Sequence, residues 1–307
     1  MLDVTPTTIL LASVGDAPAP SAAQAASDLA RWFGATLHVV HVASSATRES
    51  SSRVPAYCAL AAAVAGCAAA GGLVTRANLR VGQPDVEILA EAAEVGAALI
   101  VFCRRAHRPG DETVEQFARH APCPVLIVRD DASGWPPATI VVGDDGSDEA
   151  CGASMLGALI GGAADATGLL LRAVPPLDTE EQRHAESQLL THAAKVRQLL
   201  GRQPAVEVSP ADPASALTQA AAAAVGPALI AIGTCGMGAM GRRWLGSTAS
   251  TVLARGAAAL LLYPPRAECS FGPPHGVASH GSLPASRAVV THGAARNRRM
   301  ALPTGPG

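Results

Sequence analysis

The sequence predicts an α/β protein made of two tandem open-sheet domains, each with five parallel strands and helices on both faces. The chain has 307 residues, which suggests about two domains of roughly 100 to 200 residues each. Short apolar runs alternate with longer alanine-rich segments of helical length, as in parallel sheets with crossover helices. The same order of runs occurs twice, so we expect a duplicated domain.

Five apolar runs in each half predict the strands. In the first half they are Ile9–Val14, Thr36–Val42, Leu73–Arg80, Ala98–Phe102 and Val125–Val128. In the second half they are Thr139–Gly143, Gly168–Val174, Ala205–Val208, Ala228–Ile232 and Leu260–Tyr263. Residues agree as well as spacing, because Ala98-Leu99-Ile100-Val101 corresponds to Ala228-Leu229-Ile230-Ala231.

Turn-forming residues divide the chain. Residues 134–138 contain two prolines and read as a linker between a domain at 1–133 and a second at 139–266. From residue 267 to 307 the periodicity stops and Gly, Pro, Ser and Ala dominate. We expect this last segment to be disordered.

Composition narrows the functional class. The formal net charge is −2, so no basic field favours nucleic acid or an anionic membrane. The weakly apolar stretch 151–164 is shorter than the roughly 18 to 20 residues that span a bilayer. Seven scattered cysteines, none spaced Cys-x-x-Cys, argue against a disulfide framework or a zinc site. With no signal peptide at the start, these features predict a soluble cytoplasmic protein.

A glycine-rich loop follows the predicted strand Ala228–Ile232. It begins at Gly233 and ends at Gly246, where Ser247 and Thr248 open a predicted helix that runs to Arg255. Glycines let backbone N–H groups approach anionic oxygens, and a helix N-terminus favours an anion. The loop therefore predicts a phosphate site.

Three glycine motifs compete in this loop. Gly236, Gly238 and Gly241 fit the dinucleotide fingerprint, but no helix begins at Gly241 and no acidic residue follows about 20 residues later. The run from Gly241 to Gly246 is similar to a Walker A loop, yet its lysine position is Ser247.

The third motif, Gly-x2-Gly-x9-Gly-Ser, is met in full by Gly233, Gly236, Gly246 and Ser247. It is the ATP-binding motif of universal stress proteins, and the chain resembles this UspA-like family over 139–263 and more loosely over 8–129. The opening strand of the second half also ends in Asp145-Gly146-Ser147, as in the family. The resemblance implies a Rossmann-like fold of the adenine nucleotide alpha hydrolase type.

The resemblance also implies a ligand, ATP, and the adjacent carboxylates of Asp144 and Asp145 make Mg²⁺ a candidate companion. The resemblance assigns the ATP-binding residues as Gly143, Asp145, Ala173, Gly233, Gly236, Gly246, Ser247 and Thr248.

Other polar residues are weaker candidates. Arg242 and Arg243 are candidate phosphate contacts, and Asp144 and Asp145 are candidate metal ligands. Asp144 is equally explained as a solvated residue at a strand end. Cys235 is expected to be inert, and the two histidines of the second half, His184 and His192, are expected on a polar helix surface.

The first half lacks these features. Cys103 replaces Gly233, Val14 replaces Asp145, and Asp111-Glu112 replaces Gly246-Ser247 in a loop five residues shorter. Two carboxylates at a helix start repel phosphate. Its basic loop (Arg104, Arg105, His107 and Arg108) favours an exposed surface over a second phosphate site. We expect a structural or partner-facing copy.

Three functions remain open. The leading hypothesis is an ATP-binding stress-response module that regulates an unknown protein partner, since no nucleophile and base are poised for phosphoryl transfer. The alternatives are a slow ATPase or phosphotransferase, using Asp144 or Asp145 with Mg²⁺ and Ser247 as acceptor, and a ligand-free signalling scaffold. The resemblance further implies that the two halves pair through their last strands, with a homodimer as a further option.

Overall fold

A computed structural model provides the architecture. It describes residues 7–14, 20–43, 50–104, 119–129, 134–174, 179–235, 245–255, 258–265, 267, 271 and 290–292.

All ten predicted strands are present. The first half contains β1 (Thr8–Val14), α1 (Pro20–Phe33), β2 (Thr36–Ala43), α2 (Ser50–Ala69), β3 (Val74–Val81), α3 (Pro84–Glu94), β4 (Ala97–Arg104) and β5 (Val125–Arg129). The second half contains β6 (Thr139–Gly143), α5 (Asp148–Ala163), β7 (Thr167–Ala173), α6 (Thr179–Leu200), β8 (Ala205–Ser209), α7 (Pro213–Ala223), β9 (Ala228–Gly233), α8 (Ser247–Arg255) and β10 (Ala259–Tyr263). The predicted α/β class is therefore confirmed.

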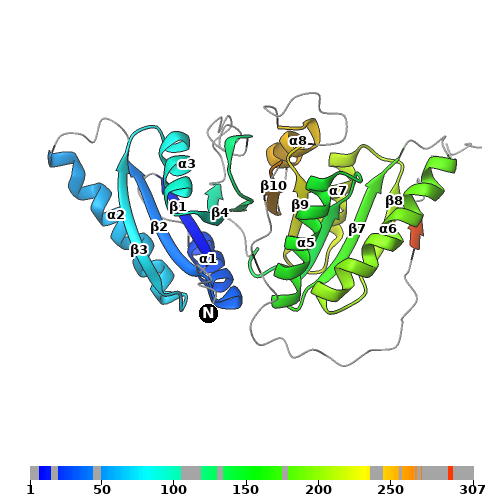
Figure 1. Ribbon diagram of the computed structural model, residues 1–307, viewed down its shortest axis with the longest axis horizontal. Helices are drawn as coiled ribbons and strands as arrows, with labels where there is room; N and C mark the ends of the chain where they lie inside the picture. Colours follow the sequence, from blue (N-terminus) through cyan, green and yellow to red (C-terminus); the bar gives the residue numbers. More distant parts are fainter. Residues whose placement is uncertain are drawn as a thin grey trace, which may run out of the picture.

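The strands form one continuous sheet in the order β11-β8-β7-β6-β9-β10-β5-β4-β1-β2-β3 (Figure 1). Within each half the pairs are parallel, and the halves join where β10 pairs with β5 antiparallel, Leu261 opposite Leu126. The halves thus pair through their last strands, as the family resemblance implies.

One strand was not anticipated. β11 (Val290–His292) pairs in parallel with residues 206–208 of β8 and covers that edge of the sheet. It lies in the segment for which composition predicts no regular structure.

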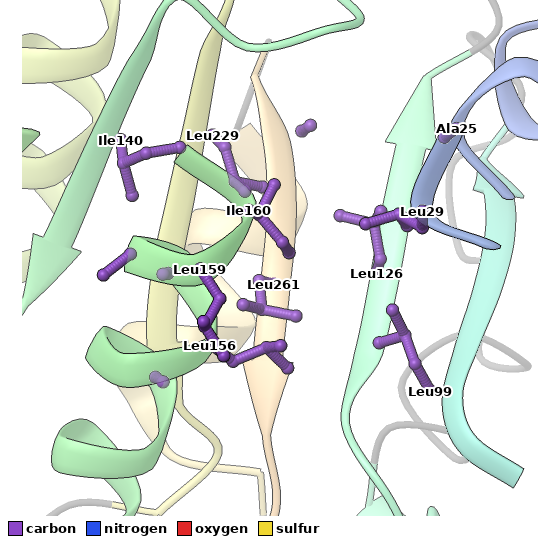
Figure 2. Packing of buried hydrophobic residues seen from close by; sticks show 14 of the residues in the cluster. Ala25, Leu29, Leu99, Leu126, Ile140, Leu156, Leu159, Ile160, Leu229 and Leu261 are labelled. Carbon is purple, nitrogen blue, oxygen red and sulfur yellow. The ribbon is translucent and has the colours of Figure 1, made fainter. Parts of the chain in front are cut away.

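Apolar side chains on both faces of the sheet hold the fold together. On the side of α1 and α5, the buried residues form one cluster that runs through both halves. Figure 2 shows Leu29 of α1 beside Leu126 of β5, and Leu156 of α5 beside Leu261 of β10. The halves therefore share a core across the β5–β10 boundary.

The linker is held against the first half. Trp135 stacks on Trp32 with ring centroids 5.9 Å apart, and its indole N–H donates to Asp28 Oδ2 at 3.0 Å. The segment from 134 to 138 therefore docks on α1.

The duplication extends to single hydrogen bonds. Thr8 and Thr36 hydroxyls lie 3.1 Å apart, and so do those of Thr139 and Thr167, each residue 131 positions after its counterpart. The turn before the second strand is left-handed in both halves, with φ 60° at Gly34 and φ 56° at Asp165.

Candidate functional site

A pocket of about 600 Å³ opens at the carboxyl ends of β6, β7 and β9. β6 lies between β7 and β9, so the chain leaves β6 toward one side and returns on the other. Ligands of open α/β sheets bind at such a switch point. The volume is within the range of roughly 300 to 1,000 Å³ that small-molecule sites occupy.

The structure brings most of the predicted ligand residues together around this pocket. Its lining includes Gly143, Asp145, Ala173, Gly233, Gly246, Ser247 and Thr248. Gly236, Arg242 and Arg243 lie outside the described residues. The roles of all of them as nucleotide contacts stay predictions.

One wall of the pocket is apolar and closely fitted. Leu171, Leu217 and Ile232 line it. A Cβ added to Gly143 would lie 2.8 Å from Ile232 Cγ2 and 3.1 Å from Leu217 Cδ1. Glycine at 143 therefore lets these two pocket-lining side chains pack directly against the end of β6.

Gly233 has a different reason to be glycine. A Cβ there would lie 2.7 Å from Glu149 Cβ and 3.3 Å from the backbone nitrogen of Ala150. The end of β9 packs directly on the first turn of α5, so this glycine serves packing as well as any ligand.

The N-terminus of α8 forms the opposite rim. Gly246 N donates to Thr234 O at 2.7 Å, and Ser250 N donates to Gly246 O at 2.9 Å as the helix begins. The N–H groups of the first helical turn have no acceptor within a helix and carry its positive dipole end. The rim beside Ser247 and Thr248 is therefore suited to an anion.

A short turn after β6 borders the pocket. Asp145 accepts hydrogen bonds from Ser147 N at 3.0 Å and Ser147 Oγ at 2.6 Å, while Gly146 between them has φ 85°. Ser147 caps α5 by accepting from Ala150 N at 3.1 Å. Asp145 is exposed at the pocket mouth, where it can meet a ligand hydroxyl or amine.

Asp144 is buried, so its interpretation as a solvated strand end is wrong. Its Oδ1 accepts from Gly146 N at 2.8 Å and pairs with Arg172, and its Oδ2 pairs with His192 Nδ1. Burial raises the pKa of Asp144, but the hydrogen bonds from His192 and Arg172 outweigh burial and lower the pKa to about 2.

Protein donors therefore occupy both oxygens of Asp144, which gives its candidacy as a metal ligand no support. Among the residues that the structure describes, no group of three or more His, Cys, Asp or Glu is placed to hold a metal ion.

His192 is not a surface residue either. Its side chain is 13% exposed, and its Nε2 lies 2.8 Å from Ser154 Oγ. Ser154, His192 and Asp144 thus have the connectivity of a catalytic triad. Ser154, however, is completely buried and its hydroxyl donates to Cys151 O at 2.7 Å, so no substrate reaches it. The triad is structural.

The corresponding positions of the first half carry larger side chains. Ala12 stands for Gly143 and Phe102 for Ile232, and both are buried. Val14 and Cys103 occupy the positions of Asp145 and Gly233, as predicted. Residues 105–118, which include the predicted Arg105, His107, Arg108, Asp111 and Glu112, lie outside the described part of the chain.

The first half instead buries charge near its outer edge. Glu91 is fully buried, pairs with Arg80, and accepts from Asn78 Nδ2 at 2.7 Å. His38 Nε2 lies 2.7 Å from Glu91 Oε1. Burial lowers the pKa of His38 and outweighs the nearby Glu91 charge.

Two further properties bear on the class of protein. No described helix is both long enough and apolar enough to cross a membrane. The six cysteines that the structure describes are free thiols.

Comparison with protein families gives two matches in the chain. Residues 6–129 and 138–264 each match the model of the universal stress protein family. No curated protein matches the chain significantly.

Solved structures support the same fold. A universal stress protein from Pseudomonas aeruginosa UCBPP-PA14 is 20% identical, with a TM-score of 0.63, over 85% of this chain and 94% of its own. One from Archaeoglobus fulgidus DSM 4304 is 16% identical, with a TM-score of 0.62, over 83% and 96%. A smaller universal stress protein from Archaeoglobus fulgidus, solved in complex with dAMP, is 24% identical over 39% of this chain and 96% of its own, with a TM-score of 0.34.

Proposed function

Because the chain belongs to the universal stress protein family, we propose that its second half is an ATP-binding regulatory module whose occupancy controls an interaction with another protein. The observation that carries the proposal is the pocket at the switch point, with an apolar wall on one side and the start of α8 on the other. An adenine ring and a phosphate chain need these two environments at once.

Binding is better supported than catalysis. Among the described residues that line the pocket, none forms a nucleophile and base pair of the kind that phosphoryl transfer requires. Asp144 lines the pocket, but its carboxylate is paired with Arg172 and with His192 of α6. We therefore place the slow ATPase second and propose that the protein acts in the cytoplasm, where its free thiols are stable.

Nucleotide binding is tested with the full chain and two matched variants. Isothermal titration with ATP and ADP is expected to give a dissociation constant tighter than about 1 mM, the lower limit of useful affinity near −4 kcal/mol. Gly143→Val projects a branched side chain toward Ile232 and Leu217, so affinity should fall by at least about tenfold, or about 1.4 kcal/mol.

Ala12→Val is the control, because it places the same side chain at the corresponding buried position of the first half. It should keep the wild-type affinity while disturbing packing to a similar extent. Equal loss in both variants, or no heat of binding in the wild type, would reject the proposal and favour a ligand-free scaffold. Nucleotide that copurifies with the wild type should also be absent after replacement of Gly246 and Ser247.

A further inference from the structure

The outer surface of α2 is apolar, which the fold alone does not require. The exposed residues described on this helix carry no charge: Val54, Pro55, Tyr57, Cys58, Ala61, Ala62, Ala65, Ala68 and Ala69. A helix that is apolar on all sides is normally buried. We call this surface the α2 face.

The corresponding helix of the second half, α6, packs on the sheet in the same way but has a charged outer surface. α6 buries Ala185, Leu189 and Val196, each 129 positions after its buried counterpart on α2 (Ala56, Leu60 and Cys67), so the two helices pack alike.

Four positions at this surface are apolar in the first half and charged in the second. Val54, Tyr57, Ala68 and Leu73 of the first half correspond to Arg183, Glu186, Arg197 and Arg202 of the second half. Leu73 is 82% exposed, Val54 65% and Tyr57 55%. Large apolar side chains gathered at one place on a surface mark an interaction site.

An open strand edge lies beside the α2 face. β3 is the last strand of the sheet and, among the described strands, pairs only with β2. Its irregularity lies at its start, near Thr75, so residues 76–81 are regular. At the opposite end of the sheet, β11 covers β8 (Figure 1). The first half thus leaves open the edge that the second half covers with its own chain.

We propose that the α2 face and the β3 edge together bind a second copy of this chain, in a two-fold dimer whose sheet continues from β3 to the partner's β3. The side chains described on the α2 face, residues 54–69, carry no charge, so this part of the helix is poorly suited to a charged partner surface or nucleic acid and is complementary to itself. Antiparallel pairing centred on Leu79 places Ala77 opposite Val81 on the side of α2, and Asn78 opposite Arg80 on the side of α3. No like charges are then directly opposite each other.

The two elements are needed together. A helix of 20 residues is about 30 Å long, so a band about 10 Å wide along it covers only about 300 Å², against about 800 Å² per partner in a stable interface. The strand edge adds main-chain hydrogen bonds and the side chains of both faces. Closed two-fold pairing also uses up the open edge, which prevents further growth of the sheet.

Sedimentation or light scattering between about 1 and 100 μM tests the dimer with the full chain, across the range in which specific interfaces of this size bind. The wild type is expected to be a dimer, and the double variant Tyr57→Glu with Ala65→Glu a monomer, with association at least tenfold weaker. Ala194→Glu is the matched control, because Ala194 is exposed at the corresponding position of α6. It should remain dimeric.

Hydrogen exchange locates the contact. Amides of residues 76–81 should be protected in the wild type and exchange faster in the double variant, whereas those of β6 and β9 should not change. Leu73→Arg, which copies the second half at an exposed position, should weaken the dimer without affecting folding. A monomeric wild type, or a dimer that survives both the double variant and Leu73→Arg, would overturn the proposal. Neither result bears on nucleotide binding.

Discussion

The two halves share one frame but bury their charges in different places. In the second half, Asp144, Arg172 and His192 form a network between the sheet and α5 and α6, next to the pocket. The first half has Ser13 and His41 at the positions of Asp144 and Arg172, and Ser13 Oγ lies 3.2 Å from His41 Nδ1.

The reverse holds at the outer edge of each half. Glu91 and His38 of the first half correspond to Ala220 and Leu169 of the second. Since each half folds without the network of the other, neither network is required by the fold. The network of the second half instead supports the turn from Asp145 to Ser147 that borders the pocket, because Asp144 accepts from Gly146 N.

The largest effect is expected from removing the charge beside the pocket. Asp144→Ala leaves the largely buried Arg172 without its counter-charge and His192 without its hydrogen-bond partner, and should reduce the free energy of unfolding by about 3 to 5 kcal/mol. The corresponding change in the first half, Ser13→Ala, removes one hydrogen bond and should cost only about 1 kcal/mol. Denaturant unfolding measures both. Equal losses in the two variants would mean that the Asp144 network contributes no more to stability than the contact between Ser13 and His41.

The network of Glu91, Arg80 and His38 at the outer edge of the first half should make the free energy of unfolding depend on pH just below neutrality. Because the pKa of His38 is lowered in the folded protein, the unfolded chain binds a proton first as pH falls below about 6.5. Stability is therefore greatest above that pH and declines below it, by at most about 1.4 kcal/mol per pH unit for one proton. The pKa of Asp144, lowered to about 2, acts only in stronger acid.

His38→Leu, which copies Leu169, should flatten this decline between about pH 6.5 and 5, where an unperturbed histidine titrates. The measurement is denaturant unfolding at a series of pH values. An unchanged slope in the variant would assign the dependence to other histidines.

The smallest effect is expected at a left-handed turn position that the two halves share but fill with different residues. Asp165 has φ 56° where the first half has Gly34 at φ 60°. Asp165→Gly should stabilise the protein by about 0.5 to 1 kcal/mol by relieving this conformation. The lost ion pair with Arg202 contributes little, because the Asp165 side chain is 88% exposed. The reverse change, Gly34→Asp, should destabilise by a similar amount, and thermal unfolding distinguishes the two signs.

Sequence patterns predicted the α/β fold because its strands and helices depend on local apolar runs. All ten runs became strands, and three residues of the glycine motif, Gly233, Gly246 and Ser247, line one pocket because parallel strands end at the same edge of a sheet. β11 was missed because it pairs through its backbone, in a segment without periodic side chains.

Contacts between residues far apart in the sequence could not be predicted from local patterns. Asp144 and His192 are 48 residues apart and lie on different elements, so no spacing rule connects them. The hint available was the Arg172 that accompanies Asp144 in neighbouring strands, since a buried carboxylate needs a partner. Gly233 was assigned to phosphate binding alone, because sequence does not reveal that α5 lies 2.7 Å from where its Cβ would be.

The antiparallel junction of β5 with β10 joins two halves of different sequence in every molecule. Two separate copies of one domain that met through this strand would always be alike, with two pockets or none. Because Leu126 and Leu261 belong to the same chain, every pair that forms at this junction contains one first half and one second half. The two halves are then free to diverge, with the pocket at β6, β7 and β9 in the second half and the α2 face in the first.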